Sequence, residues 1–423
     1  MKLHKIIAAI VFIFVALCQV KAQLTPIDPI GNGDKSGWQT GGGLPPNAPQ
    51  PRKVVWVHGL EGSTDSWGKY ANLFQGQRQM SSVRVEYANE DVAGRNATQI
   101  SQAPGIITSQ LNENGVQQSA SSRNIFVGHS MGGLVTREMD RALTATNQTP
   151  FFGGFVTVAT PNGGAPLAQA VIDGKVDNFM GDGIRSVAAG PLLTAAPFIK
   201  IANWFGAGIE ISIDKVVVDM KAAIFKKFDF ATGPMLDLPS SSKFMTDLNG
   251  FTHNKKMIAI VAKEDAPSMY REISSLMGLF NSSPTDLPLN VTNDGLLNQG
   301  VRVGITIYQG IEDIYWWRKK LAIFKNPRNH YAACEVAYRR GWQWLENAPT
   351  VWNSIVSNGS GELNDGIVPE SSAGALSGAT ATEVLGVNHQ ECMNHPNVTQ
   401  KLGDIFDGNV GNTQSEKDFF KTQ

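Results

Sequence analysis

Residues 126–135 read F-V-G-H-S-M-G-G-L-V and are the part of the chain that says most about its chemistry. Its apolar start is typical of the end of a buried strand, and after G-H-S-M-G the pattern becomes helical. A strand, a sharp turn and a helix in this order lift a serine oxygen out of the backbone, so Ser130 is the candidate nucleophile. Side chains at Gly128 or Gly132 would collide across such a strained turn. Because G-x-S-x-G also occurs by chance, the rest of the chain must supply partners for the serine.

Donors for a developing oxyanion are predicted from a block upstream of the serine. Residues 53–57 form a short run rich in β-branched side chains, which ends at His58-Gly59-Leu60. The glycine lets backbone amides turn towards a bound carbonyl group. The Leu60 and Met131 amides are therefore the predicted oxyanion donors, the second from the residue after the nucleophile.

The acid and the base are predicted downstream of the serine. Asp365 lies in an Asn-Asp-Gly turn, and His389 follows an apolar stretch, which gives the chain order serine, acid, histidine. His395 is the rival base, and Asp265, at the end of a predicted strand, is the reserve acid. Asp294 lies in a second Asn-Asp-Gly turn and is interpreted as a turn residue.

Taken as a set, the motifs V-H-G-L, G-H-S-M-G-G, N-D-G-I-V-P followed by S-S, and N-H-x-E resemble the secreted bacterial lipases and esterases of the α/β-hydrolase superfamily. Residues 159–166, A-T-P-N-G-G-A-P, also resemble a segment of those enzymes. The resemblance implies an α/β-hydrolase fold and hydrolysis of a small-molecule or lipid carboxylic ester through an acyl-enzyme on Ser130. An amidase, a peptidase or an acyltransferase with the same triad remains an alternative, as does a non-catalytic binding protein that kept the fold.

A metal site is left open by the same resemblance. The lipases in question place a calcium-binding carboxylate two residues after the histidine, where this chain has Glu391, and Asp265 could supply a second carboxylate. The alternative is that Glu391 forms a hydrogen bond that pins the loop. No further ligand is evident, so the sequence predicts no cofactor other than this calcium ion.

Composition and the first residues bear on location and partners. The chain has 423 residues, 42% of them apolar, with 36 basic against 37 acidic side chains, which shows no bias towards nucleic acid. Residues 1–22 have the basic start, apolar core and small-residue cleavage site of a signal peptide. Cleavage near Ala22 predicts a secreted or periplasmic protein. Cys18 admits a lipoprotein alternative, which the bulky residue before it disfavours.

Two cysteines remain after cleavage, Cys334 and Cys392. In an oxidising compartment they can form one disulfide, worth about 4 kcal/mol in the chain-entropy model. The alternative of two buried thiols stays open.

The remaining sequence alternates between predicted strands and helices, which is typical of a mostly parallel sheet with helices on both faces. The strands are predicted at 53–57, 83–87, 124–128, 153–159, 256–262 and 382–387, and helices at 65–76, 96–113 and 132–146. The core is predicted to comprise residues 53–166, 253–267 and 360–410, after an extended leader at 23–52.

Two long insertions interrupt this core, a cap or lid at 167–252 and a second insertion at 268–359. The first is rich in large apolar side chains, among them Trp204 and Phe205, which either pack the cap or bind an acyl chain. A lid of this kind would also permit transient contact with a lipid interface. The second holds five of the nine tryptophans, which build a small core or line an apolar pocket. The sequence does not indicate an oligomeric state.

Overall fold

The computed structural model describes residues 52–60, 62–78, 80–87, 100–113, 116–119, 122–186, 189, 214, 233–264 and 327–422, with only part of the side chains between 327 and 346. Several predictions fall outside these residues. They concern the signal peptide and leader, Trp204, Phe205, Asp265, Asp294 and the side chain of Cys334.

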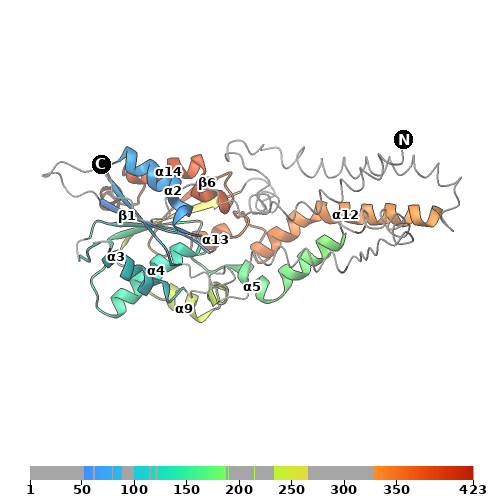
Figure 1. The fold of residues 1–423 in the computed structure, drawn as a ribbon, viewed down its shortest axis with the longest axis horizontal. Helices are drawn as coiled ribbons and strands as arrows, with labels where there is room; N and C mark the ends of the chain where they lie inside the picture. Colours follow the sequence, from blue (N-terminus) through green and yellow to red (C-terminus); the bar gives the residue numbers. More distant parts are fainter. Residues whose placement is uncertain are drawn as a thin grey trace, which may run out of the picture.

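A parallel sheet forms the core of the body drawn at the left of Figure 1. In the described part of the chain, six strands pair in the order β2-β1-β3-β4-β5-β6, and each of these pairings is parallel. The strands are β1 (Arg52–Val57), β2 (Met80–Val85), β3 (Ile125–His129), β4 (Gly154–Val158), β5 (Lys256–Lys263) and β6 (Thr380–Leu385). This arrangement confirms the predicted fold class, an α/β-hydrolase-like fold.

Helices cover both faces of the sheet (Figure 1). The helices α2 (Gly68–Gln77), α14 (Pro396–Phe406) and α15 (Gln414–Phe420) pack on one face, and α3 (Ala103–Glu113), α4 (Met131–Ala145) and α9 (Lys243–Asn249) on the other. Successive side chains of a strand point to opposite faces. Val54 and Trp56 of β1 accordingly belong to a first buried cluster, which packs against α2 and α14. Val55 and Val57 belong to a second buried cluster, which packs against α3, α4 and α9.

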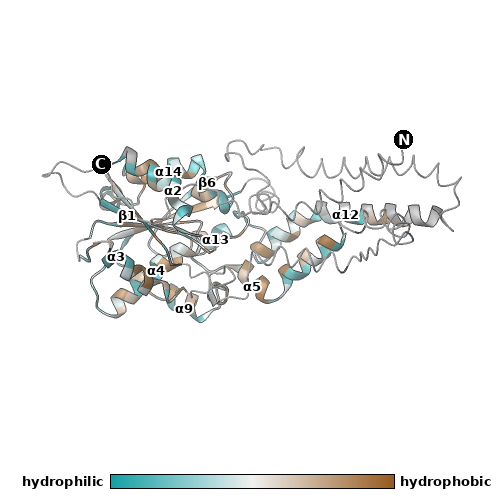
Figure 2. Ribbon diagram, viewed as in Figure 1, coloured by the Kyte–Doolittle hydropathy of each residue, from teal (hydrophilic) through white to brown (hydrophobic). Residues whose placement is uncertain are grey.

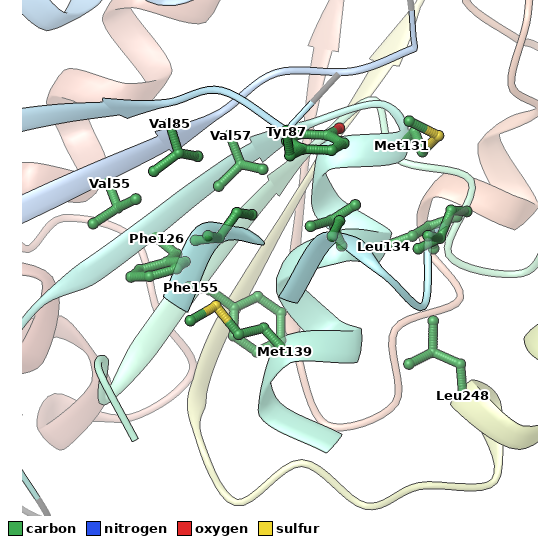
Figure 3. Packing of buried hydrophobic residues seen from close by; sticks show 14 of the residues in the cluster. Val55, Val57, Val85, Tyr87, Phe126, Met131, Leu134, Met139, Phe155 and Leu248 are labelled. Atoms are coloured by element: carbon green, nitrogen blue, oxygen red, sulfur yellow. The ribbon is translucent and has the colours of Figure 1, made fainter. Parts of the chain in front are cut away.

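The second cluster fixes the helix that begins at the nucleophile turn. Met131, Leu134 and Met139 of α4 belong to one buried cluster with Phe126 and Phe155 of the sheet (Figure 3). Each large apolar side chain buried in this way contributes about 1.5–3 kcal/mol of transfer free energy. The packing therefore holds the start of α4 rigidly against the end of β3.

Strand β2 begins earlier than its apolar pattern predicts. Ser81 and Ser82 are buried although they are polar. The Ser82 hydroxyl accepts a hydrogen bond from Trp56 Nε1 and donates one to the Ala71 carbonyl, both at 3.1 Å. Because these bonds satisfy the hydroxyl, the strand can start at Met80 rather than at residue 83.

Parts of the two predicted insertions lie side by side and extend away from the sheet (Figure 1). Helix α5 (Pro166–Ile172) and the helical residues 175–186 come from the first insertion and its boundary, and α12 (Pro327–Val356) comes from the second. The Phe179 ring lies 5.1 Å from Trp344 and 5.7 Å from Trp352, measured between centroids. Teal and brown residues both occur along α5 and α12, as in helices with one buried and one exposed face (Figure 2). We name α5, residues 175–186 and α12 together the arm.

The later part of the first insertion packs on the body instead. Helix α8 (Gly233–Asp237) precedes α9, whose Met245 and Leu248 belong to the same cluster as α4. Across the described ranges, no helix combines the length and the apolar character needed to cross a membrane.

Candidate active site

Ser130 lies at the sharp turn between β3 and α4. Its backbone has φ 54° and ψ −129°, a conformation that L-residues rarely adopt. The Ser130 amide donates to the Val158 carbonyl at 2.9 Å, which fixes the turn to β4. A Cβ on Gly128 would approach the backbone of Gly132 to 2.5 Å, and one on Gly132 would collide with the carbonyl groups of Val57 and His58. The predicted need for both glycines is thus confirmed.

A chain of hydrogen bonds joins Ser130 to a histidine and an acid. His389 Nε2 lies 2.8 Å from Ser130 Oγ, and His389 Nδ1 lies 2.8 Å from Asp365 Oδ2. Because the carboxylate only accepts, Nδ1 carries the proton and Nε2 is left to accept from the serine hydroxyl. Asp365 and His389 are both buried, which strengthens these contacts by excluding water.

Hydrogen bonds from several residues fix the turn that carries Asp365, residues 364–369, which we name the acid turn. Asp365 Oδ1 accepts from the amides of Ile367 and Val368, at 3.0 and 2.7 Å. The Asp365 carbonyl accepts from the His389 amide at 2.8 Å. Gly366 has φ 98°, which favours glycine at this position of the turn. The carboxylate therefore has one oxygen committed to its own turn and the other to the histidine.

The predicted oxyanion residues lie on either side of the serine. Met131 begins α4 directly after Ser130, where helical amides lack partners within the helix. Leu60 follows Gly59, whose Cα lies so close to the serine that an added Cβ would be 2.9 Å from Ser130 Cβ. A side chain at position 59 would thus push the strand-end loop away from the nucleophile.

The segment at residues 159–166 is hydrogen-bonded to the short helix that follows the acid turn. The Asn162 side chain donates to the Ala373 carbonyl at 2.8 Å, and the Ser372 hydroxyl donates to the Gly164 carbonyl at 2.6 Å. Ala373 and Ser372 belong to α13 (Glu370–Ala373), the short helix that follows the acid turn. In this structure residues 159–166 therefore hold α13 in place.

A buried arginine links the same segment to α9. Arg137 of α4 donates to the Asn162 carbonyl at 2.9 Å and to Asn249 Oδ1 at 2.7 Å. Burial lowers the pKa of Arg137 to about 10, so it stays charged at neutral pH. Arg137 therefore joins α4, α9 and the segment at residues 159–166.

Glu391 stabilises the loop at residues 386–391, which carries His389 and which we name the histidine loop. Its Oε2 accepts from the Asn388 amide at 3.3 Å, and its own amide donates to Asn388 Oδ1 at 2.9 Å. These reciprocal bonds flank His389 and match the alternative to calcium binding. Asp265, the other predicted calcium ligand, lies outside the described residues. No group of three or more His, Cys, Asp or Glu side chains suited to a metal ion occurs among the residues that are described.

The next residue, Cys392, is buried, with its Sγ 3.3 Å from the Asn388 carbonyl oxygen. A bridge to Cys334 stays a prediction.

The structure separates His389 from its rival. His395 is the N-cap of α14, and its Nδ1 accepts from the Asn397 amide at 3.1 Å. It therefore stabilises a helix start, while His389 contacts the serine.

Two contacts at the site could not be inferred from the sequence. His129 Nε2 lies 3.0 Å from the His389 carbonyl oxygen, and Trp352 Nε1 donates to the Gly366 carbonyl at 2.9 Å. His129 lies within the G-H-S-M-G motif, but no pattern in the sequence connects it with the His389 carbonyl. No pattern in the sequence connects Trp352 with the acid turn.

Comparison with known proteins links the chain to serine esterases. Residues 50–173 match the profile of a family described as "Putative serine esterase (DUF676)". The match covers less than half of the chain but includes β1 to β4 and Ser130. No curated protein matches the sequence.

Solved structures with some similarity include bacterial lipases and esterases. The mature lipase BlEst2 of Bacillus licheniformis is 13% identical, with a TM-score of 0.41, over 88% of this chain and 98% of that one. Est816, described as an N-acyl homoserine lactone degrading enzyme, is 11% identical, with a TM-score of 0.36, over 88% of this chain and 95% of that one. The phospholipase PlaB of Legionella pneumophila is 14% identical, with a TM-score of 0.33, over 52% of this chain and 40% of that one. At these values the similarities carry no functional argument.

Proposed function

We propose that the protein is a secreted serine hydrolase that cleaves carboxylic esters through an acyl-enzyme on Ser130. The observation that carries the proposal is the hydrogen-bonded chain from Ser130 through His389 to Asp365, with 2.8 Å at each contact. The match of residues 50–173 to a serine esterase family supports the same chemistry.

The proposed reaction begins when Ser130 Oγ attacks the ester carbonyl carbon while His389 Nε2 takes the hydroxyl proton. Asp365 holds the Nδ1 proton and stabilises the imidazolium. The C–O bond to the leaving alcohol then breaks, and His389 returns the proton to that alcohol. Water, activated by His389, attacks the acyl-enzyme in the same way and releases the carboxylic acid and free Ser130.

The negative charge that develops on the carbonyl oxygen needs preorganised donors. We assign this role to the amides of Leu60 and Met131. The support is the close approach of Gly59 to Ser130 and the position of Met131 at the start of α4.

Substrate choice is proposed to depend on the first insertion. Its apolar side chains, among them Trp204 and Phe205, would receive the acyl chain and allow transient contact with a lipid surface. Trp204→Ala should then lower kcat/KM about 10- to 200-fold more for long-chain than for short-chain esters, which corresponds to about 1–3 kcal/mol of lost transition-state binding. An equal loss for all chain lengths, with a lower Tm, would assign the residue to packing alone.

Export is a separate part of the proposal. The support is the signal-peptide pattern of residues 1–22. The expressed full-length chain should appear outside the cytoplasm with a new N-terminus near Gln23, which N-terminal sequencing would reveal. An intact N-terminus on the folded protein would contradict it.

The reaction class is tested by rates of hydrolysis for a chain-length series of esters and one matching amide. The proposal expects ester hydrolysis by the wild type, a much slower amide reaction, and a loss of several orders of magnitude in Ser130→Ala. An amide cleaved faster than its ester would instead support an amidase or peptidase. A folded wild type that hydrolyses neither would support a binding protein.

A further inference from the structure

The contact between His129 and His389 fixes the protonation state of His129. A carbonyl oxygen can only accept, so Nε2 of His129 must carry the hydrogen that bonds it to the His389 carbonyl at 3.0 Å. Nδ1 of His129 is buried and has no hydrogen-bond partner among the residues that the structure describes, so a second proton would have no acceptor there. Complete burial, and then the neighbouring His389, lower the pKa of His129 well below 6.5. His129 is therefore a neutral, fixed donor.

His389 is held at its backbone and its ring by different parts of the fold. Its amide and its Nδ1 both bond to Asp365, and so they tie it to the acid turn. Its carbonyl bonds to His129, the last residue of β3 and the neighbour of Ser130. The His129 bond thus joins the histidine loop to the nucleophile strand without using any atom that reacts.

The ring of His129 is itself kept in place by packing. Trp67 lies edge-on to it with 6.3 Å between ring centroids, and the Trp67 Nε1 donates to the Val57 carbonyl at 3.0 Å. The His129 and His389 rings are 4.8 Å apart. The donor is therefore rigid on the side of the sheet and can transmit the position of β3 to His389.

We infer that His129 is a positioning residue, which sets the distance between His389 Nε2 and Ser130 Oγ by holding the His389 carbonyl. The inference rests on the proposed function, because it assumes that His389 is the base. Losing the donor removes the hydrogen bond that ties the His389 backbone to β3, and leaves the bonds to the acid turn and those between Asn388 and Glu391. Since a misplacement of about 1 Å can cost about 100-fold in rate, the loss should appear in kcat.

The test compares His129→Gln with His129→Met. The two side chains are similar in size, and the amide nitrogen of glutamine is separated from Cα by as many bonds as Nε2 of histidine, so only glutamine can donate to the His389 carbonyl. The expected result is a kcat lowered about 10- to 100-fold in His129→Met with little change in KM, and a kcat within about 10-fold of wild type in His129→Gln. The rate of inactivation by an organophosphonate should fall in parallel, because it reports activation of Ser130 without deacylation.

Equal kcat values for the two variants, whether high or low, would overturn the inference, since the donor would then make no difference. If His129→Met does not fold, His129→Asn replaces it, because its amide is too short to reach the carbonyl. Ser130→Ala separates this outcome from failure of the proposed function. Activity in Ser130→Ala removes the function itself, whereas an inactive Ser130→Ala beside a fully active His129→Met removes only the role of His129.

Discussion

At the scale of single residues, the site depends on which atom of each side chain is committed to which partner. Asp365 uses Oδ1 for the amides of its own turn and Oδ2 for His389 Nδ1. This division allows a substitution that changes one partnership and spares the other.

Asp365→Asn should lower kcat by about 10⁴-fold with little change in Tm. The asparagine oxygen can still accept from the turn amides, but its NH₂ group faces His389 Nδ1, which must then accept. The proton moves to Nε2, which can no longer take the serine proton. Steady-state kinetics and a thermal melt on the same sample check both parts, and wild-type kcat in a folded Asp365→Asn would contradict the assigned acid.

His395→Ala should keep most of the activity and lose stability by about 0.5–2 kcal/mol, because it removes the cap of α14. His395→Asn is the matched control, since asparagine is a good N-cap and should restore stability. His389→Ala should be as inactive as Ser130→Ala, because members of one catalytic unit are not additive. An inactive but well-folded His395→Ala, next to an active His389→Ala, would move the base to His395.

Motif residues and their partners differ in how far the sequence could predict them. Ser130, Asp365 and His389 could be predicted because turn glycines and chain order mark them. The bond from His129 to His389 spans residues that are 260 positions apart, and no local pattern encodes such a contact. Long-range hydrogen bonds of this kind become visible only when the fold brings two loops together.

At the scale of elements, the strands were predicted well because apolar runs between turn residues mark buried parallel strands. All six observed strands overlap their predicted ranges. The ends were less accurate where polar residues are buried, as in β2, or where the strand lies at the edge. The edge strand β6 ends at Leu385 and has exposed residues at alternate positions, so its apolar pattern was shifted by two residues.

Helix α12 shows the opposite case. Its 30 residues lie where the sequence predicted a small aromatic core or the lining of an apolar pocket, and no long helix. Trp344 and Trp352 contact Phe179 from the other insertion, and neither insertion alone contains the signal for that pairing.

A glycine substitution in the turn between β3 and α4, compared with a control substitution in α3, tests how tightly the turn is packed. Gly132→Ala places a methyl group against the carbonyl groups of Val57 and His58, so it should destabilise the fold by several kcal/mol. The methyl group of Gly105→Ala in α3 meets no atom of the described residues within 4 Å, so this substitution should stabilise the fold by about 0.5–1 kcal/mol. Denaturant melts on both variants measure this difference. Equal stabilities would mean that the turn is looser than the structure describes.

At the scale of the whole molecule, the arm and the sheet meet at the acid turn. The amide of Glu264, at the end of β5, donates to the Asn364 carbonyl at 2.9 Å, and Trp352 of α12 bonds to the carbonyl of Gly366. The position of Asp365 therefore depends on the arm as well as on the sheet.

Trp352→Phe should lower kcat/KM by severalfold to about 10-fold, since one hydrogen bond contributes about 0.5–1.5 kcal/mol. The phenyl ring keeps the contact with Phe179 but cannot donate to Gly366. Trp344→Phe is the control, because Trp344 also contacts Phe179 and lies earlier in α12. Kinetics on one short-chain ester compare the two, and equal effects would show that the arm acts through packing and not through the acid turn.

The most direct test of the whole account is to label the wild-type protein with an organophosphonate and to locate the adduct by peptide mass spectrometry. Only a serine activated by a hydrogen-bonded base reacts readily with such a reagent. We expect one adduct, on Ser130, with ester hydrolysis lost in step with labelling and no adduct in Ser130→Ala. An adduct on another residue, or full ester hydrolysis by a folded Ser130→Ala, would contradict it.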